Sequence, residues 1–167
     1  MESFFHGKSA GVDPLNSYLT IPIVIKSKDD INVTGIPSQK LDGTGAVFLI
    51  DSGKTGSTAP MVSIFMEKMK SEGFRKMIST QFIKHTNLCV DSFLNGDVKN
   101  LFDNTKKLSK IVLDNFKPMI PDEFHDLWKK GIDSGSYFLK LCGSGGGGYI
   151  LGFAPNIEQA KNDLKEY

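Results

Sequence analysis

A glycine-rich segment near the end of the chain has residue types that could bind a phosphate. Five of the six residues from Gly143 to Gly148 are glycine, and a short apolar run lies on each side of them. Glycine reaches positive φ at little cost and lets another group approach the backbone closely. A row of such residues can direct several amide N–H groups toward one anion. A flexible linker is the alternative, but the apolar flanks favour a loop between two strands.

A second segment whose residue types could take part in a reaction lies at the start of the chain. Glu2, His6 and Asp13 fall within twelve residues, together with two glycines. A carboxylate beside a turn can accept a proton from a substrate hydroxyl. Another carboxylate can hold Mg²⁺ when phosphates supply further oxygens. Each acid also has a plainer interpretation, because Asp13 can cap the turn before Pro14 and Glu2 can lie on an exposed terminus.

The two segments together resemble the GHMP kinases, a superfamily named after galacto-, homoserine, mevalonate and phosphomevalonate kinases. The pattern Glu-x-x-x-His-Gly-x-x-x-Gly-Val-Asp, from Glu2 to Asp13, is similar to the central motif of mevalonate kinases. The pattern Lys-Leu-x-Gly-Ser-Gly-Gly-Gly-Gly, from Lys140 to Gly148, is similar to the third motif of the superfamily. The resemblance extends over nearly the whole chain.

The resemblance implies a role for several residues. Asp13 falls at the position of the catalytic aspartate, and Glu2 at that of a glutamate that coordinates Mg²⁺. His6 and Thr58 fall near the substrate pocket, although His6 can instead tie the turn before Asp13. Thr58 and its neighbour can equally cap a helix that begins at Pro60. The residues expected to close over the ATP phosphates are Gly143, Ser144, Gly145, Gly146 and Gly147.

The chain also departs from the family pattern. Ser9-Ala10 stands where mevalonate kinases usually have Pro-Ser, and Cys142 stands where the third motif usually has Thr. Nothing matches the family's second motif, a glycine- and serine-rich loop that grips the triphosphate, and the basic residue that acts with the aspartate is missing. The resemblance therefore implies the C-terminal part of a kinase, inactive alone, whose partner is an upstream N-terminal half.

The function implied is ATP-dependent phosphoryl transfer to the hydroxyl of a small metabolite, with ATP and Mg²⁺ as cofactors. Mevalonate is the expected substrate, which would place the protein in isoprenoid synthesis. The alternatives are a phosphomevalonate, homoserine or sugar kinase, a diphosphomevalonate decarboxylase, or a non-catalytic binding domain that kept the fold.

Composition excludes several other classes. The 167 residues include 20 basic and 19 acidic side chains, so the chain offers no strong field for nucleic acid or an anionic membrane. Two cysteines cannot form a disulfide framework. No apolar run approaches the roughly 20 residues that span a bilayer, and no signal peptide is evident at the N-terminus. We therefore expect a cytoplasmic protein with no nucleic-acid or membrane partner.

The periodicity of apolar residues predicts an α+β fold. We expect a GHMP-kinase C-terminal domain over residues 43–167, with an antiparallel sheet and a run of packed helices, preceded by a remnant of the N-terminal domain over residues 1–42. An unpaired edge on the strand from Leu19 to Lys26 favours association and is compatible with a homodimer. The predicted strands are Leu19–Lys26, Ile31–Ile36, Ala46–Asp51, Ser136–Cys142 and Tyr149–Phe153; the predicted helices cover 60–72, 78–94, 98–116, 122–132 and 157–166.

Overall fold

The computed structural model describes residues 23–27, 29–34 and 44–167. The chain divides into two compact units, residues 1–38 and residues 39–167, and each is described here by itself.

The described part of the first unit is a β-hairpin. Strands β1 (Ile23–Ser27) and β2 (Asp30–Val33) pair in antiparallel fashion, with a register irregularity after Ile25. They overlap the two strands that the sequence predicts in this region. The outer ends of those predictions, residues 19–22 and 35–36, lie outside the described residues.

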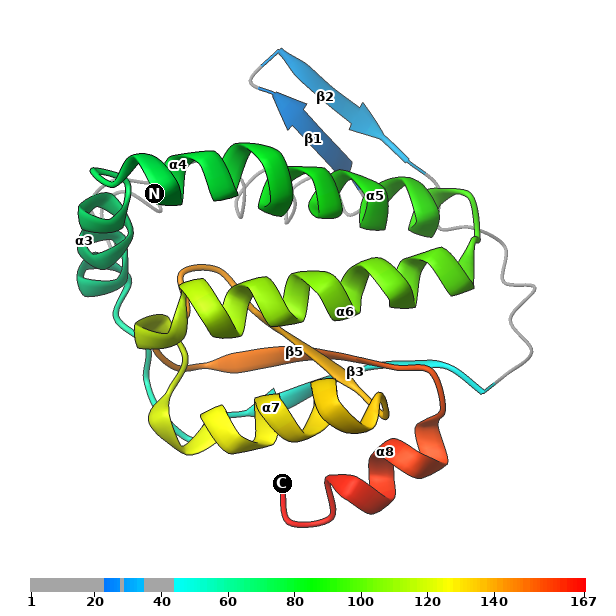
Figure 1. Cartoon of the computed structure of the whole chain (residues 1–167). Helices are drawn as coiled ribbons and strands as arrows, with labels where there is room; N and C mark the ends of the chain where they lie inside the picture. The colour runs from blue at the N-terminus through cyan, green and yellow to red at the C-terminus, as the bar shows by residue number, and fades with distance from the viewer. Residues whose placement is uncertain (1–22, 28, 35–43) are drawn as a thin grey trace. The chain divides into compact units, whose positions relative to one another are not determined.

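The second unit begins with a strand, continues through a run of helices and ends with a hairpin and a helix (Figure 1). This order confirms the α+β class, with a small antiparallel sheet and packed helices. In chain order the elements are β3 (Ala46–Asp51), α3 (Thr58–Lys68), α4 (Glu72–Met77), the π-helical turn η1 (Ile78–Phe82), α5 (Ile83–Leu94), α6 (Val98–Asn115), the short 3₁₀ turns η2 (Lys117–Met119) and η3 (Asp122–Phe124), α7 (His125–Ser134), β4 (Phe138–Leu141), β5 (Tyr149–Ala154) and α8 (Ile157–Asp163).

The sheet of this unit brings the glycine-rich loop beside the end of β3. Its strand order is β3-β5-β4, and both pairs are antiparallel. Asp51 at the end of β3 pairs with Tyr149, and Leu141 at the end of β4 pairs with Ile150. The loop that joins β4 to β5 therefore lies at the same end of the sheet as the segment that follows β3. Helices α6 and α7 pack against the sheet, and α5 packs along α6 (Figure 1).

Buried hydrogen bonds join the sheet to these two helices. Trp128 of α7 is fully buried, and its indole N–H donates to the carbonyl of Ser109 in α6 at 3.0 Å. The Ser109 hydroxyl accepts from the amide of Leu139 in β4 at 3.2 Å. Tyr137 is also fully buried and donates its phenol O–H to the carbonyl of Leu127 at 2.9 Å. Buried polar groups whose hydrogen bonds are satisfied favour one specific packing of the core.

The sequence predicts one helix over residues 60–72, before Gly73, whereas the structure ends α3 at Lys68 and begins α4 at Glu72. Gly73 instead lies in the first turn of α4, where backbone N–H groups have no partner within the helix and a glycine costs little. The chain turns at residues 69–71. There the Arg75 guanidinium donates to the carbonyls of Met69 and Lys70, both at 2.8 Å. This side chain satisfies carbonyls left free at the end of α3, so the helix ends before the glycine.

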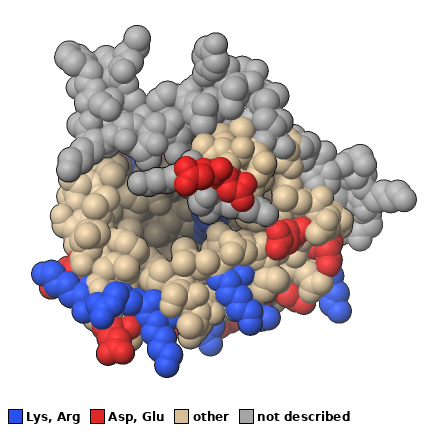
Figure 2. Space-filling view, turned by 90° about the horizontal axis from the view of Figure 1, so that it is seen from above, with Lys and Arg blue, Asp and Glu red and all other residues tan. Residues whose placement is uncertain are grey.

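The described surface carries mixed charge. On the face seen in Figure 2, basic side chains lie beside acidic ones and no large area of one sign stands out. This distribution agrees with the net charge of +1. Within the described ranges, no helix combines the length and the apolar character needed to cross a bilayer.

Candidate functional site

The loop between β4 and β5 consists largely of glycines with positive φ. These are Gly143 (60°), Gly145 (77°), Gly146 (78°), Gly147 (149°) and Gly148 (72°). Residues with a Cβ rarely adopt such angles. The loop therefore needs glycine for its backbone path, which is more than a flexible linker would require.

The loop is also wedged between two other segments. A Cβ on Gly145 would lie 2.5 Å from the carbonyl oxygen of Met119, at the end of η2. A Cβ on Gly147 would lie 2.7 Å from the amide nitrogen of Gly56, in the segment that follows β3. Both neighbours are backbone atoms, so neither can move aside cheaply. The two glycines thus permit a close contact on each side of the loop.

Hydrogen bonds fix the loop to these same segments. The amide of Gly146 donates to the Met119 carbonyl at 2.7 Å, and the amide of Gly148 donates to the Lys54 carbonyl at 2.8 Å. The carbonyl of Gly148 accepts from the amide of Ser52 at 2.9 Å. The amide of Gly145 donates to the Cys142 carbonyl at 3.4 Å, so Gly145 and Gly146, among the five residues that the sequence offers to a phosphate, already use their amides within the protein.

Three other amides of the loop make no hydrogen bond within the described part of the protein and are candidates for an anion site. Within the described part of the chain, the backbone N–H groups of Gly143, Ser144 and Gly147 have no hydrogen-bond partner, nor does the Ser144 hydroxyl. Gly143 is exposed, whereas Ser144 and Gly147 are partly exposed. Successive backbone amides can form a concave donor set for a phosphate group, and Gly143 and Ser144 are successive residues. The amides of Gly143, Ser144 and Gly147 thus make up the candidate anion site, and we call residues 143–148 the glycine loop.

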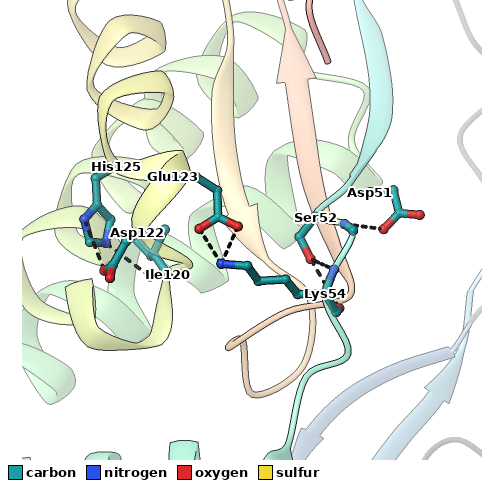
Figure 3. A network of polar contacts seen from close by, with 8 residues as sticks. Asp51, Ser52, Lys54, Ile120, Asp122, Glu123 and His125 are labelled. Carbon is teal, nitrogen blue, oxygen red and sulfur yellow. Dashed lines mark hydrogen bonds and ion pairs between the residues drawn. The ribbon is translucent and has the colours of Figure 1, made fainter.

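An ion pair joins the two segments that hold the glycine loop. The ammonium of Lys54 lies 2.7 Å from both carboxylate oxygens of Glu123 in η3 (Figure 3). The hydrogen bond from Lys54 lowers the pKa of Glu123 below its ordinary value, so this carboxylate is anionic at neutral pH. The sequence does not reveal the contact, because its partners are 69 positions apart.

His125 supports the turn that carries Met119. Its Nε2 lies 3.1 Å from the carbonyl oxygen of Ile120 (Figure 3) and 3.1 Å from that of Lys117, so an N–H at this position can donate to either. On its other side, Nδ1 lies 3.8 Å from a carboxylate oxygen of Asp122. His125 therefore bridges the start of α7 to the segment 117–120 that bonds to the glycine loop.

The other predicted site residues are placed only in part. Thr58 is the first residue of α3 and is exposed, and it makes no side-chain hydrogen bond to a described residue. Ser57 precedes it at the N-cap without a capping hydrogen bond, and the helix begins before Pro60, so the capping interpretation has no support here. Glu2, His6 and Asp13 lie outside the described residues. Among residues 23–27, 29–34 and 44–167, no group of three or more His, Cys, Asp or Glu side chains could hold a metal ion.

Two open hollows flank α7, one lined by α6 and the other by the C-terminal segment, and the glycine loop lines neither.

Comparisons of the chain with protein-family models, with curated proteins and with solved structures found no match. A function for this chain is therefore inferred from its two motifs and from the geometry of the glycine loop.

Proposed function

We propose that this chain is part of an ATP-dependent small-molecule kinase of the GHMP type, with mevalonate as the favoured substrate. Two segments of the chain support the proposal, because they resemble two motifs of mevalonate kinases and follow one another in the same order. The single structural observation behind it is the glycine loop, in which Gly143, Ser144 and Gly147 present unpaired amides from a backbone that is fixed on both sides.

The proposed reaction depends on positioning and charge more than on covalent help from the protein. The substrate oxygen attacks the γ-phosphorus, the bond to the bridging oxygen of ADP breaks, and the hydroxyl proton passes to the carboxylate of Asp13. Amides of the glycine loop stabilise the charge that develops on the phosphate oxygens. Glu2 would hold Mg²⁺, and the ion would supply positive charge that offsets the negative charge of the ATP phosphates.

A fixed loop suits this role. Donors that are already oriented need no reorganisation when the phosphate charge develops, so their effect on the transition state is larger. The hydrogen bonds at Gly146 and Gly148 provide that fixation. They also leave fewer donors for the nucleotide, and we expect an upstream N-terminal half to supply the rest of the triphosphate contacts.

A second candidate function is a binding domain without catalysis. The observation that favours it is the internal use of the Gly146 and Gly148 amides, which would also stabilise a loop that serves only as a hairpin connection. The two candidates differ in whether the chain binds Mg·ATP and whether it contributes to turnover.

The test is equilibrium binding of Mg·ATP to the 167-residue chain by isothermal titration calorimetry, followed by coupled ADP release with mevalonate when the upstream half is present. Gly146→Val should weaken binding, because a β-branched residue resists a φ of 78° and its Cβ would lie 2.9 Å from the sulfur of Met61. Gly96→Val is the matched control, since Gly96 has a φ of 68° in a different turn. Binding that is absent, or equal in both variants and wild type, would count against the glycine loop as a phosphate site.

A further inference from the structure

We propose that Lys54 is a phosphate-binding residue whose ammonium is held by Glu123 until an anion occupies the glycine loop. The inference rests on the proposed function. It adds Lys54 as a ligand of the phosphate and Glu123 as a competitor for the Lys54 ammonium. It assigns to the Lys54–Glu123 ion pair the role of a latch that ligand binding opens.

The position of Lys54 follows from its own backbone. Its carbonyl accepts the amide of Gly148 at 2.8 Å, so its ammonium lies within about one side-chain length of the glycine loop. Glu123 lies four residues after Met119, whose carbonyl accepts the amide of Gly146. The Lys54 side chain thus joins the two segments that hold the loop, as Figure 3 shows. The backbones of Lys54 and Gly147 are also close, because a Cβ on Gly147 would lie 2.9 Å from the Lys54 carbonyl oxygen, so rotation of the Lys54 side chain can direct its ammonium toward an anion at Gly147.

The latch is weak enough to open. The side chains of Lys54 and Glu123 are 56% and 39% exposed, so water screens their attraction. A nucleotide triphosphate carries several negative charges, whereas Glu123 carries one. Charge-assisted hydrogen bonds from lysine to phosphate are among the stronger polar contacts. An anion in the loop therefore competes favourably with Glu123 for the same ammonium.

The neighbouring carboxylates have partners other than Lys54. Asp122 lies next to Glu123 in η3, and its carboxylate pairs with Nδ1 of His125 at 3.8 Å rather than with Lys54. Asp51, at the end of β3, accepts the amide of Gly53 through a carboxylate oxygen at 2.9 Å. Glu123 is therefore the carboxylate that holds Lys54, and removal of this one acid should free the ammonium.

This competition predicts whether each substitution raises or lowers the affinity for the anion. If Glu123 and the anion compete for Lys54, the apparent affinity for the anion equals its intrinsic affinity multiplied by the fraction of molecules in which Lys54 is not bound to Glu123. Removing Glu123 should tighten anion binding by about two- to fivefold, which is the range of an exposed ion pair. Removing the Lys54 charge should weaken binding by about tenfold or more, as expected for a hydrogen bond to a charged group.

The experiment compares Mg·ATP dissociation constants of the full chain by calorimetry. The variants are Glu123→Gln, Lys54→Met and the charge-conserving Lys54→Arg. Matched controls are Glu158→Gln and Lys161→Met, which remove the same charges from an exposed ion pair of 3.0 Å on α8, at the opposite end of β5. Circular dichroism shows that each variant remains folded.

We expect tighter binding only for Glu123→Gln, weaker binding only for Lys54→Met, and binding within about threefold of wild type for Lys54→Arg. A wild-type chain that binds Mg·ATP, with Lys54→Met unchanged or Glu123→Gln no tighter than Glu158→Gln, overturns the latch and leaves the proposed function standing. A wild-type chain that binds no Mg·ATP overturns the proposed function and the latch together.

Discussion

Substitution of Gly145 by alanine tests whether the glycine loop is held in close backbone contact with Met119 or is only a turn between two strands. Gly145 and Gly143 have similar φ values, 77° and 60°, so an alanine at either position pays the same conformational cost of about 1 kcal/mol. Only Gly145 has a neighbour, because a Cβ there would lie 2.5 Å from the Met119 carbonyl oxygen, whereas nothing lies within 4 Å of a Cβ on Gly143. Relief of that overlap must displace the backbone and weaken the bond from Gly146 to Met119.

Overpacking against a fixed group costs about 1–3 kcal/mol, and a lost backbone hydrogen bond costs about 1 kcal/mol. We therefore expect Gly145→Ala to lower the free energy of unfolding by about 3–5 kcal/mol and Gly143→Ala by about 1 kcal/mol. Urea unfolding followed by the fluorescence of Trp128, the one tryptophan of the chain, measures both values. Equal losses in the two variants would refute the close contact with Met119.

Three further predictions concern catalysis, the core and pH. Asp13→Asn should lower the turnover of the proposed kinase, with its upstream half present, by orders of magnitude with little change in Mg·ATP affinity; coupled ADP release measures this, and unchanged turnover would remove Asp13 from the proposed reaction. Leu139→Ala should destabilise the chain by about 2–5 kcal/mol, because Leu139 is 1% exposed, whereas Leu49→Ala should cost about 0.5 kcal/mol or less, because Leu49 is 58% exposed; similar urea midpoints for the two would contradict the fold. Since Lys54 lowers the pKa of Glu123 below its ordinary value of 4.5, the stability from this pair is present above that pH and is lost as the pH falls through the folded-state pKa; unfolding curves of wild type and Glu123→Gln should therefore converge under acid conditions, and a difference that persists there would have another origin.

Local patterns in the sequence were sufficient to predict most elements of the second unit. The strand Ala46–Asp51 has the predicted bounds, and α5 ends where Asn95-Gly96 signals a C-terminus, with Gly96 at a φ of 68°. The last helix also begins with a residue type that favours the N-cap, since the Asn156 side chain accepts the amides of Glu158 and Gln159. These features depend on residues close in sequence, which periodicity and capping rules describe.

Features that depend on distant residues were not predictable in the same way. The end of α3 depends on a guanidinium six positions beyond Met69, and the π-helical turn η1 has no local signal that we recognise. The sequence predicts that the glycines turn back between two strands, but it does not predict that Met119 and Lys54 bond to them. The number of free amides in the loop, and the latch to Glu123, follow only from the packing of segments far apart in the chain.

The central claim is that the free amides of the glycine loop bind the phosphates of a nucleotide. Titration of the ¹⁵N-labelled chain with Mg·ATP, followed by amide chemical shifts, measures this directly. We predict the largest shifts at Gly143, Ser144 and Gly147, and smaller ones at Gly146 and Gly148, whose amides are already bonded within the protein. Saturable binding that leaves the first three amides unmoved, or no binding at millimolar Mg·ATP, would contradict the claim.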